Sequence, residues 1–129
     1  MSAFDWYKYI SVAEILKDFA TEESSRAGIS RSYYAAFGKT KIFCLNNSIV
    51  KSAEAQQNKN KIHQFIITKL LDSDHEDLYL LGQHMQTLRN RRNDADYNAE
   101  CIESGKVSLL VNSISLAKEV IVLIKDYNP

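Results

Sequence analysis

Three arginines within four residues, Arg89, Arg91 and Arg92, form the one strong local cluster of positive charge in the sequence. A guanidinium group donates two parallel hydrogen bonds to a phosphate or a carboxylate, so arginine is well suited to hold such an anion. Asn93 follows directly and adds an amide donor, and Tyr97 lies about one helical turn beyond it. These residue types at this spacing predict a small phosphate-binding site.

Arg92 also continues an apolar stripe along its helix. The stripe steps by three and four residues, as one face of an α-helix does, and Arg92 and Ala95 are its next members after Leu78, Leu81, Met85 and Leu88. The stripe therefore directs Arg92 inward. Because an unpartnered guanidinium group loses several kcal/mol on leaving water, Arg92 needs a carboxylate, a second chain or a phosphate.

Two interpretations of Arg92 follow from this need. In the structural one, Asp94, Asp96 or an acid on another helix neutralises Arg92, while Arg89 and Arg91 stay solvated near the helix C-terminus, where positive charge is favoured. In the functional one, Arg92 donates in a fork to a phosphate, and Arg89 and Arg91 raise the local positive potential. The two interpretations differ in whether Arg92 has an acidic partner within the fold.

The elements that position these residues are helices. The chain has 129 residues, which fits one domain over 1–129, and its single proline is the last residue. Apolar residues recur at three and four throughout, without strand-like alternation, so we expect an all-α helical bundle. We expect helices at 4–19, 24–45, 61–71 and 106–127, and one that follows the acidic turn 72–77 and carries the arginines. The polar stretch 46–60 is predicted to be a mobile connection.

Charge and cysteine usage narrow the class of protein. Sixteen lysines and arginines balance sixteen acids, so attraction for nucleic acid must come from local clustering. Cys44 and Cys101 have no metal-ligand spacing and fit a reducing cytoplasm. The N-terminus lacks signal-peptide features, and the longest unbroken apolar run, 120–124, is far too short to cross a bilayer. We therefore expect a soluble cytoplasmic protein without a cofactor, a metal or a membrane contact.

The helix at 106–127 is apolar over more than one face, with a second stripe beside the first. A central position in the bundle explains this pattern, and so does a second protomer that covers the outer stripe. We expect a homodimer.

Two segments carry a family resemblance. SRSYYAAF at 30–37, followed by LRNRRNDADYN at 88–98, resembles the HEPN family of small helical domains. The resemblance implies an up-and-down bundle of four long helices with a shorter extra one, usually as a homodimer. Many HEPN members are metal-independent endoribonucleases of toxin–antitoxin or phage-defence systems, which implies RNA as a ligand and a cognate antitoxin as a partner.

The sequence departs from the motif of active HEPN members, in which an arginine is followed after four to six residues by a histidine. Arg92 and Asn93 match the first two positions, but Tyr97 stands where the histidine would be, and no histidine follows. Instead the segment resembles a HEPN branch in which the arginine leads into Ala-Asp-Tyr. Tyrosine ionises near pH 10 and histidine near 6.5, so Tyr97 is a poor base. The resemblance thus implies a degenerate endoribonuclease site formed by Arg92, Asn93 and Tyr97.

An alternative function belongs to another class, a non-catalytic dimeric interaction module. There Arg92 pairs with Asp96 or with an acid of the second chain, and a separately encoded nucleotidyltransferase-like partner supplies the chemistry. Around the site, the resemblance implies that Arg31 pairs with an acid to hold its helix against the arginine helix. Tyr33 and Tyr34 are expected to pack between helices, or to direct their hydroxyl groups toward the arginines.

The three histidines are weaker candidates. His84 lies about two turns before the arginines, so it would reach them only across a two-fold interface; otherwise it is a partly exposed side chain. His63 and His75 are predicted to be surface residues. The acids around His75 lack an ordered ligand loop, so no metal site is expected.

Overall fold

The computed structural model describes residues 3–129, and these residues form helices without any strand. Three helices are long, two have ten residues and one has six. Two short 3₁₀ helices, η1 and η2, lie between them. Their bounds are α1 Lys8–Lys17, α2 Glu22–Asn46, α3 Ser52–Gln57, η1 Lys59–Lys61, α4 Ile62–Leu71, α5 Glu76–Tyr97, η2 Ile102–Gly105 and α6 Val107–Asp126.

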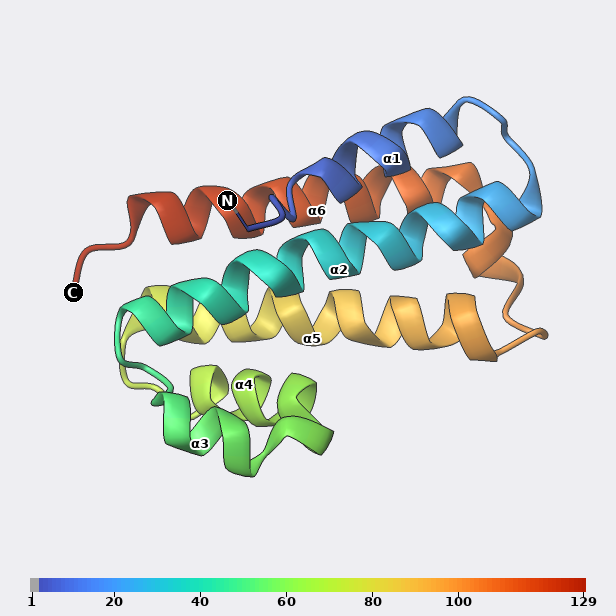
Figure 1. The fold of residues 1–129 in the computed structure, drawn as a ribbon. Coiled ribbons are helices and arrows are strands. Elements are labelled where there is room, and N and C mark those ends of the chain that lie inside the picture. Colours follow the sequence, from blue (N-terminus) through green and yellow to red (C-terminus); the bar gives the residue numbers. More distant parts are fainter. Residues whose placement is uncertain (1–2) are drawn as a thin grey trace.

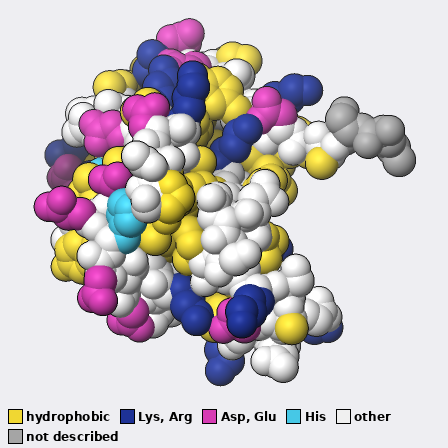
Figure 2. Space-filling model, turned by 90° about the vertical axis from the view of Figure 1, so that its left-hand side faces the viewer, with side chains coloured by type: hydrophobic (Ala, Val, Ile, Leu, Met, Phe, Trp, Pro, Cys, Tyr) yellow, Lys and Arg dark blue, Asp and Glu magenta, His cyan; other side chains and the backbone are white. Residues whose placement is uncertain are grey.

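The long helices α2, α5 and α6 lie alongside one another, and α1 covers α2 and α6 (Figure 1). The short helices α3 and α4 lie below, where α4 packs on α5. Seen from the end where α2 leads into α3, the surface is hollowed between the N-terminal segment and the lower part of the molecule (Figure 2). The prediction of an all-α helical bundle is confirmed.

The central helix α2 packs closely on its neighbours because small residues leave room. A Cβ atom on Gly28 would lie 2.6 Å from Leu110 Cδ1, and one on Gly38 would lie 2.1 Å from Trp6 Cγ. Thr21 caps the start of α2, since its hydroxyl oxygen accepts a hydrogen bond from Ser24 N at 3.2 Å. The cap and the small residues fix α2 as the scaffold on which the arginine helix α5 rests.

Two predicted elements differ from the structure. The first helix is shorter than expected, because Ala20 adopts a positive φ of 54° after it and reverses the chain. The stretch 46–60 is not the loose connection that its polar composition predicts, because it contains α3 and η1 and buries Val50 completely. Glu54 stabilises this stretch through Lys51 N at 3.0 Å and Lys69 Nζ at 3.1 Å. The prediction was wrong since one buried valine and one capping acid suffice to order a polar segment.

Helix α6 packs on α1, α2 and α5, and these contacts account for its buried apolar stripe. One stripe is buried and the second is partly buried against α1, α2 and α5, while Val111 and Val122 remain exposed. By length and composition, α6 alone among the helices of residues 3–129 would suffice to span a bilayer, with 28% of its apolar window buried. Its Lys118 forms an ion pair with Glu14 of α1 at 2.9 Å, which ties α6 to the bundle.

Candidate anion-binding site

Arg92 lies on the buried face of α5, as the apolar stripe predicts, and is only 7% exposed. Its guanidinium carbon lies 5.2 Å, 5.5 Å and 5.8 Å from the ring centroids of Tyr33, Tyr34 and Tyr97. Its Nε has no hydrogen-bond partner, and the side chain makes no ion pair with any residue of 3–129. A positive charge is thus buried among aromatic rings without a carboxylate.

The two acids nearest in sequence do not neutralise Arg92. Asp96 accepts a hydrogen bond from Ser30 Oγ of α2 at 3.1 Å. Asp94 accepts one from Asn98 Nδ2 at 3.5 Å, on the surface of the molecule. The structural interpretation, in which Asp94, Asp96 or an acid of another helix pairs with Arg92, therefore has no support within residues 3–129.

The other two arginines of the cluster lie on different sides of α5. Arg89 lies one turn before Arg92 and donates from Nη1 to Gln64 Oε1 of α4, while its Nε has no partner. Arg91 points away from both, toward α6, where its Nη1 donates to Ser113 Oγ at 3.3 Å and where burial lowers its pKa. The prediction that all three arginines act together is wrong for Arg91, because successive helical residues are rotated by about 100°.

Tyr33 and His63 form a buried pair beside the arginines. Tyr33 Oη lies 2.6 Å from His63 Nδ1, and the His63 ring stacks on Phe37 with centroids 4.0 Å apart. Burial raises the pKa of Tyr33 above its usual value. Burial and the charges of Arg92 and Arg89 lower the pKa of His63 to about 4, so its ring is neutral near pH 7.

His63 was predicted to be a surface residue, but it is half-buried and contacts Tyr33 and Phe37. It lies three residues before Ile66 and seven before Leu70, both of which are completely buried on the inner face of α4. Helical periodicity places His63 on that same face. The sequence therefore held a signal for its position, and the residue belongs to the candidate site.

Arg31 does not have the acidic partner that was predicted for it. Its guanidinium carbon lies 4.7 Å from the Tyr9 ring centroid and 4.9 Å from that of Tyr34, and it makes no ion pair in the part of the chain that the structure describes. The Tyr34 ring is thus close to two guanidinium groups, those of Arg31 and Arg92. Arg31 joins α2 to α1 through aromatic contacts, which require no acid.

A residue that the sequence analysis did not single out, Arg26 of α2, holds the end of the arginine helix. Its terminal nitrogens donate to five main-chain carbonyl oxygens at 2.8–3.4 Å. The last carbonyl groups of a helix lack partners within the helix, and a positive charge is favoured there. Arg26 therefore closes α5 and the turn after it, contacting Asp94, Ala95, Asn98, Ala99 and Cys101.

The remaining predicted residues differ in their access to Arg92. Tyr97 is 77% exposed at the rim of the site, and Asn93 is half-buried next to Arg92 in the chain. His84 lies on the other side of α5, with Nε2 3.7 Å from Glu119 Oε2 of α6, so it does not reach Arg92 within one chain. His75, also predicted to be a surface residue, caps α5, packs beside Tyr127 and is half-buried. No group of metal-ligating side chains occurs in residues 3–129.

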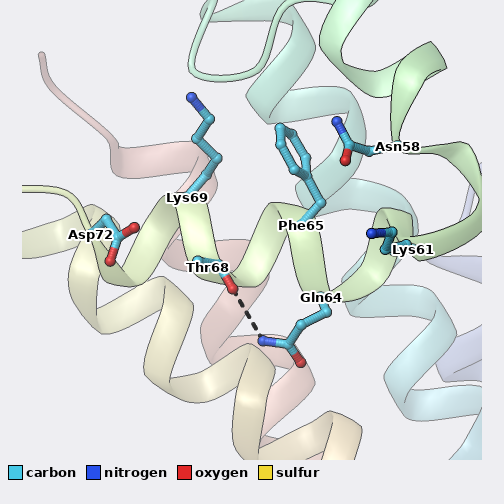
Figure 3. Close-up of a pocket in the computed structure, with 7 residues that line it drawn as sticks. All are labelled: Asn58, Lys61, Gln64, Phe65, Thr68, Lys69 and Asp72. Atoms are coloured by element: carbon cyan, nitrogen blue, oxygen red, sulfur yellow. Dashed lines mark hydrogen bonds between the residues drawn. The ribbon is translucent and has the colours of Figure 1, made fainter.

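A separate hollow, of about 580 Å³, lies on the outer side of α4 (Figure 3). Gln64 points there toward Thr68, to which its Nε2 donates at 3.2 Å, while Phe65 and Lys69 rise on the opposite side of the helix. Among these lining residues, Gln64 alone hydrogen-bonds to an arginine, Arg89. Its side chains carry mixed charges around one half-buried ring, so they do not converge on a ligand.

Comparisons with protein-family models, with curated proteins and with solved structures found no match for this chain. The proposed function is therefore based on the sequence pattern and on the geometry of the arginine site.

Proposed function

We propose that this protein is an RNA-associated domain in which Arg92 and Arg89 bind a backbone phosphate. The observation that carries the proposal is the buried guanidinium group of Arg92, which has aromatic neighbours and no carboxylate. A phosphate supplies the negative charge and the paired acceptor oxygens that this group lacks. The Nε atoms of Arg89 and Arg92 also lack a hydrogen-bond partner within residues 3–129.

The distribution of charge supports a nucleic-acid strand rather than a single small anion. The chain has no net charge, yet six cations near α2, η1, α4 and α5 make no ion pair within residues 3–129. Lys41 and Lys59 line one hollow of this surface, and Lys61 lines another on α4. A polyanion gains affinity from such a surface by releasing counterions. The six are Arg31, Lys41, Lys59, Lys61, Arg89 and Arg92.

Exposed tyrosine complements the arginines. The ring of Tyr97 stands at the rim, with its centroid 5.8 Å from the guanidinium carbon of Arg92. Unstacked bases of single-stranded RNA stack on aromatic rings, while phosphates bind to arginine. Tyr97 would then hold a base next to the phosphate, a role in binding that needs no ionised tyrosine.

A second candidate function, metal-independent RNA cleavage, is favoured by His63. In such a reaction the 2′-hydroxyl oxygen bonds to phosphorus, the bond from phosphorus to the 5′-oxygen breaks, and a cyclic phosphate forms. A neutral histidine accepts the 2′-hydroxyl proton, and water protonates the leaving oxygen. His63 is neutral near pH 7, but its pKa of about 4 makes it a weak base, so we place cleavage second to binding.

The resemblance to HEPN domains agrees with an RNA-associated role and is the ground for proposing a toxin–antitoxin or phage-defence setting. It also supports a homodimer and a nucleotidyltransferase-like antitoxin as partners. Two free cysteines, one buried and one half-buried, agree with a reducing compartment such as the cytoplasm.

Binding of labelled single-stranded RNA, measured by fluorescence anisotropy in EDTA, tests the proposal. We expect Arg92→Ala to weaken binding at least about tenfold, a loss of about 1.4 kcal/mol. Arg91→Ala is the matched control, because Arg91 is a neighbouring arginine that faces α6, and it should bind RNA nearly as wild type does. RNA affinity that is absent in wild type, or lost equally in both variants, would contradict the proposal.

The same samples separate binding from cleavage on a denaturing gel. Wild-type cleavage that is lost in His63→Gln and in Arg92→Ala supports the ribonuclease candidate. Intact RNA beside Arg92-dependent binding supports a binding domain. Activity gained in Tyr97→His supports a site whose histidine has been replaced.

A further inference from the structure

A cavity of about 350 Å³ lies next to the arginine site, between the N-terminal segment, α2 and α4. Aromatic rings from all three parts of the chain line it, and they belong to Trp6, Tyr34, Phe37 and His63. The hollow between the N-terminal segment and the lower part of the molecule in Figure 2 is where these elements face one another. The phosphate site accounts for Tyr34 and His63 among the four rings, and Trp6 and Phe37 have no role in it.

The aromatic walls are held in place by contacts with one another and with neighbouring rings. Trp6 packs against the bare backbone of Gly38, where a Cβ would lie 2.1 Å from its Cγ. Its ring also meets Phe4 and Tyr9 edge to face, with centroids 5.2 Å and 5.6 Å apart. On the opposite wall, His63 stacks on Phe37 at an interplanar angle of 17°. A flat ligand would therefore meet preformed aromatic surfaces.

Two polar groups enter this aromatic cavity. Lys41 is half-buried there and makes no ion pair with residues 3–129, so its ammonium group has donors to spare. His63 uses Nδ1 toward Tyr33 Oη, which leaves Nε2 for a ligand. Since the His63 ring is neutral near pH 7, Lys41 contributes the positive charge within the cavity.

We propose that this cavity receives one unstacked purine base of the RNA strand whose phosphate is held by Arg92, an inference that rests on the proposed RNA binding. Its volume falls in the range of small-ligand sites, roughly 300–1,000 Å³. Aromatic walls stack on a base, and guanine presents two adjacent acceptors, O6 and N7, to a lysine. Tyr34 connects the two places, because it lines the cavity and its ring centroid lies 5.5 Å from the Arg92 guanidinium carbon.

Tryptophan fluorescence reports occupancy directly, because Trp6 is the single tryptophan of the chain. Titration with guanosine 5′-monophosphate should quench Trp6 to saturation, and uridine 5′-monophosphate should require about tenfold higher concentration. Ribose 5-phosphate, which has the phosphate and no base, should leave the emission unchanged. Absence of quenching by the guanine nucleotide, or equal quenching by ribose 5-phosphate, overturns the proposal.

Variants of the cavity leave the arginines intact. Ile42→Phe adds volume to the cavity wall, and Lys41→Met removes the ammonium group but keeps the length of the side chain. Each variant should bind the guanine nucleotide at least about tenfold more weakly than wild type does. Val122→Phe, on the exposed side of α6, is the control for adding a phenyl group and should bind as wild type does.

RNA binding by the same variants separates the two proposals. RNA affinity that depends on Arg92 but is unchanged in Ile42→Phe and Lys41→Met overturns the base cavity and leaves the phosphate site standing. Failure of wild type to bind both RNA and nucleotide overturns both. Quenching by the nucleotide in a protein that binds no RNA marks a site for free nucleotides and overturns the assignment to an RNA strand.

Discussion

Two arginines at the contact between α2 and α5 have opposite surroundings. Arg26 of α2 donates to five carbonyl oxygens at the end of α5. Arg92 of α5 lies among three tyrosine rings, has an unpartnered Nε and makes no ion pair within residues 3–129. Carbonyl oxygens accept hydrogen bonds from the N–H groups of a guanidinium group. The face of an aromatic ring accepts no strong hydrogen bond, and its attraction to the positive charge contributes only about 0.5–2 kcal/mol.

Because their surroundings differ, Arg26 and Arg92 have different roles. Arg26 uses its hydrogen-bonding capacity inside the fold, so its contribution is to stability. Arg92 retains hydrogen-bonding capacity, so we propose that it contributes to ligand binding. Arg26 is half-buried and also pairs with Glu22 Oε1 at 3.3 Å, whereas Arg92 is buried without an ion pair in residues 3–129.

The largest expected effect is on the free energy of unfolding of Arg26→Met. This change removes the donors of five carbonyl groups and should destabilise the protein by about 3 kcal/mol, since each hydrogen bond to a charged group contributes roughly 1.5–3 kcal/mol and the set is not additive. Urea unfolding followed by circular dichroism measures it. A decrease in the free energy of unfolding below about 1 kcal/mol would show that water readily replaces Arg26, and would contradict the difference in role between Arg26 and Arg92.

A smaller effect concerns pH and His63, which lies beside Arg92. Its pKa is about 4 in the folded protein and near 6.5 in the unfolded chain, so the unfolded chain binds more protons in acid. The stability of the folded protein that is linked to His63 protonation is therefore fully present above about pH 6.5 and is lost as the pH falls toward 4. Between about pH 7 and pH 5.5 the free energy of unfolding should fall by about 1 kcal/mol.

Two variants isolate this pH effect. His63→Gln should flatten the dependence of stability over the same interval. Arg92→Met should raise the pKa of His63, because a neighbouring positive charge is removed, and nuclear magnetic resonance titration of the ring measures the shift. A His63 pKa near 6.5 in the wild-type protein would contradict this description of the site.

The effect of Arg92→Met on stability should be smaller still, within about 1 kcal/mol of wild type. Replacing an unpaired buried charge by an apolar side chain of similar length is often neutral or stabilising. RNA binding should nevertheless be lost. Destabilisation as large as that of Arg26→Met would give the two arginines the same structural role.

The smallest expected effect on stability is that of Tyr97→Ala, within about 0.5 kcal/mol, because the side chain is mostly exposed. Its RNA affinity should fall by about 1–3 kcal/mol if a base stacks on the ring. Tyr79→Ala, another exposed tyrosine of α5, is the control and should leave RNA binding unchanged. Equal affinity of Tyr97→Ala and wild type would remove Tyr97 from the site.

Helical periodicity predicted the bundle and the inward direction of Arg92, because both follow from apolar residues spaced by three and four. The same periodicity indicates the inner position of His63 through Ile66 and Leu70, and this signal was missed in favour of the usual surface position of histidine. The role of Arg26 has no comparable signal in the sequence. Its partners are main-chain carbonyl groups about seventy residues away, and every residue type has such a group. Arg31 shows the reverse, since aromatic rings replaced the acid that its charge led us to expect.

Resonances of the arginine Nε–Hε groups, recorded by nuclear magnetic resonance while single-stranded RNA is added, test the central claim most directly. Arg92 and Arg89, whose buried Nε atoms have no partner in the free protein, should shift in a saturable manner, whereas Arg26 should stay in place. Shifts confined to Arg26 or to exposed lysines, with Arg92 unmoved while RNA binds, would contradict the account.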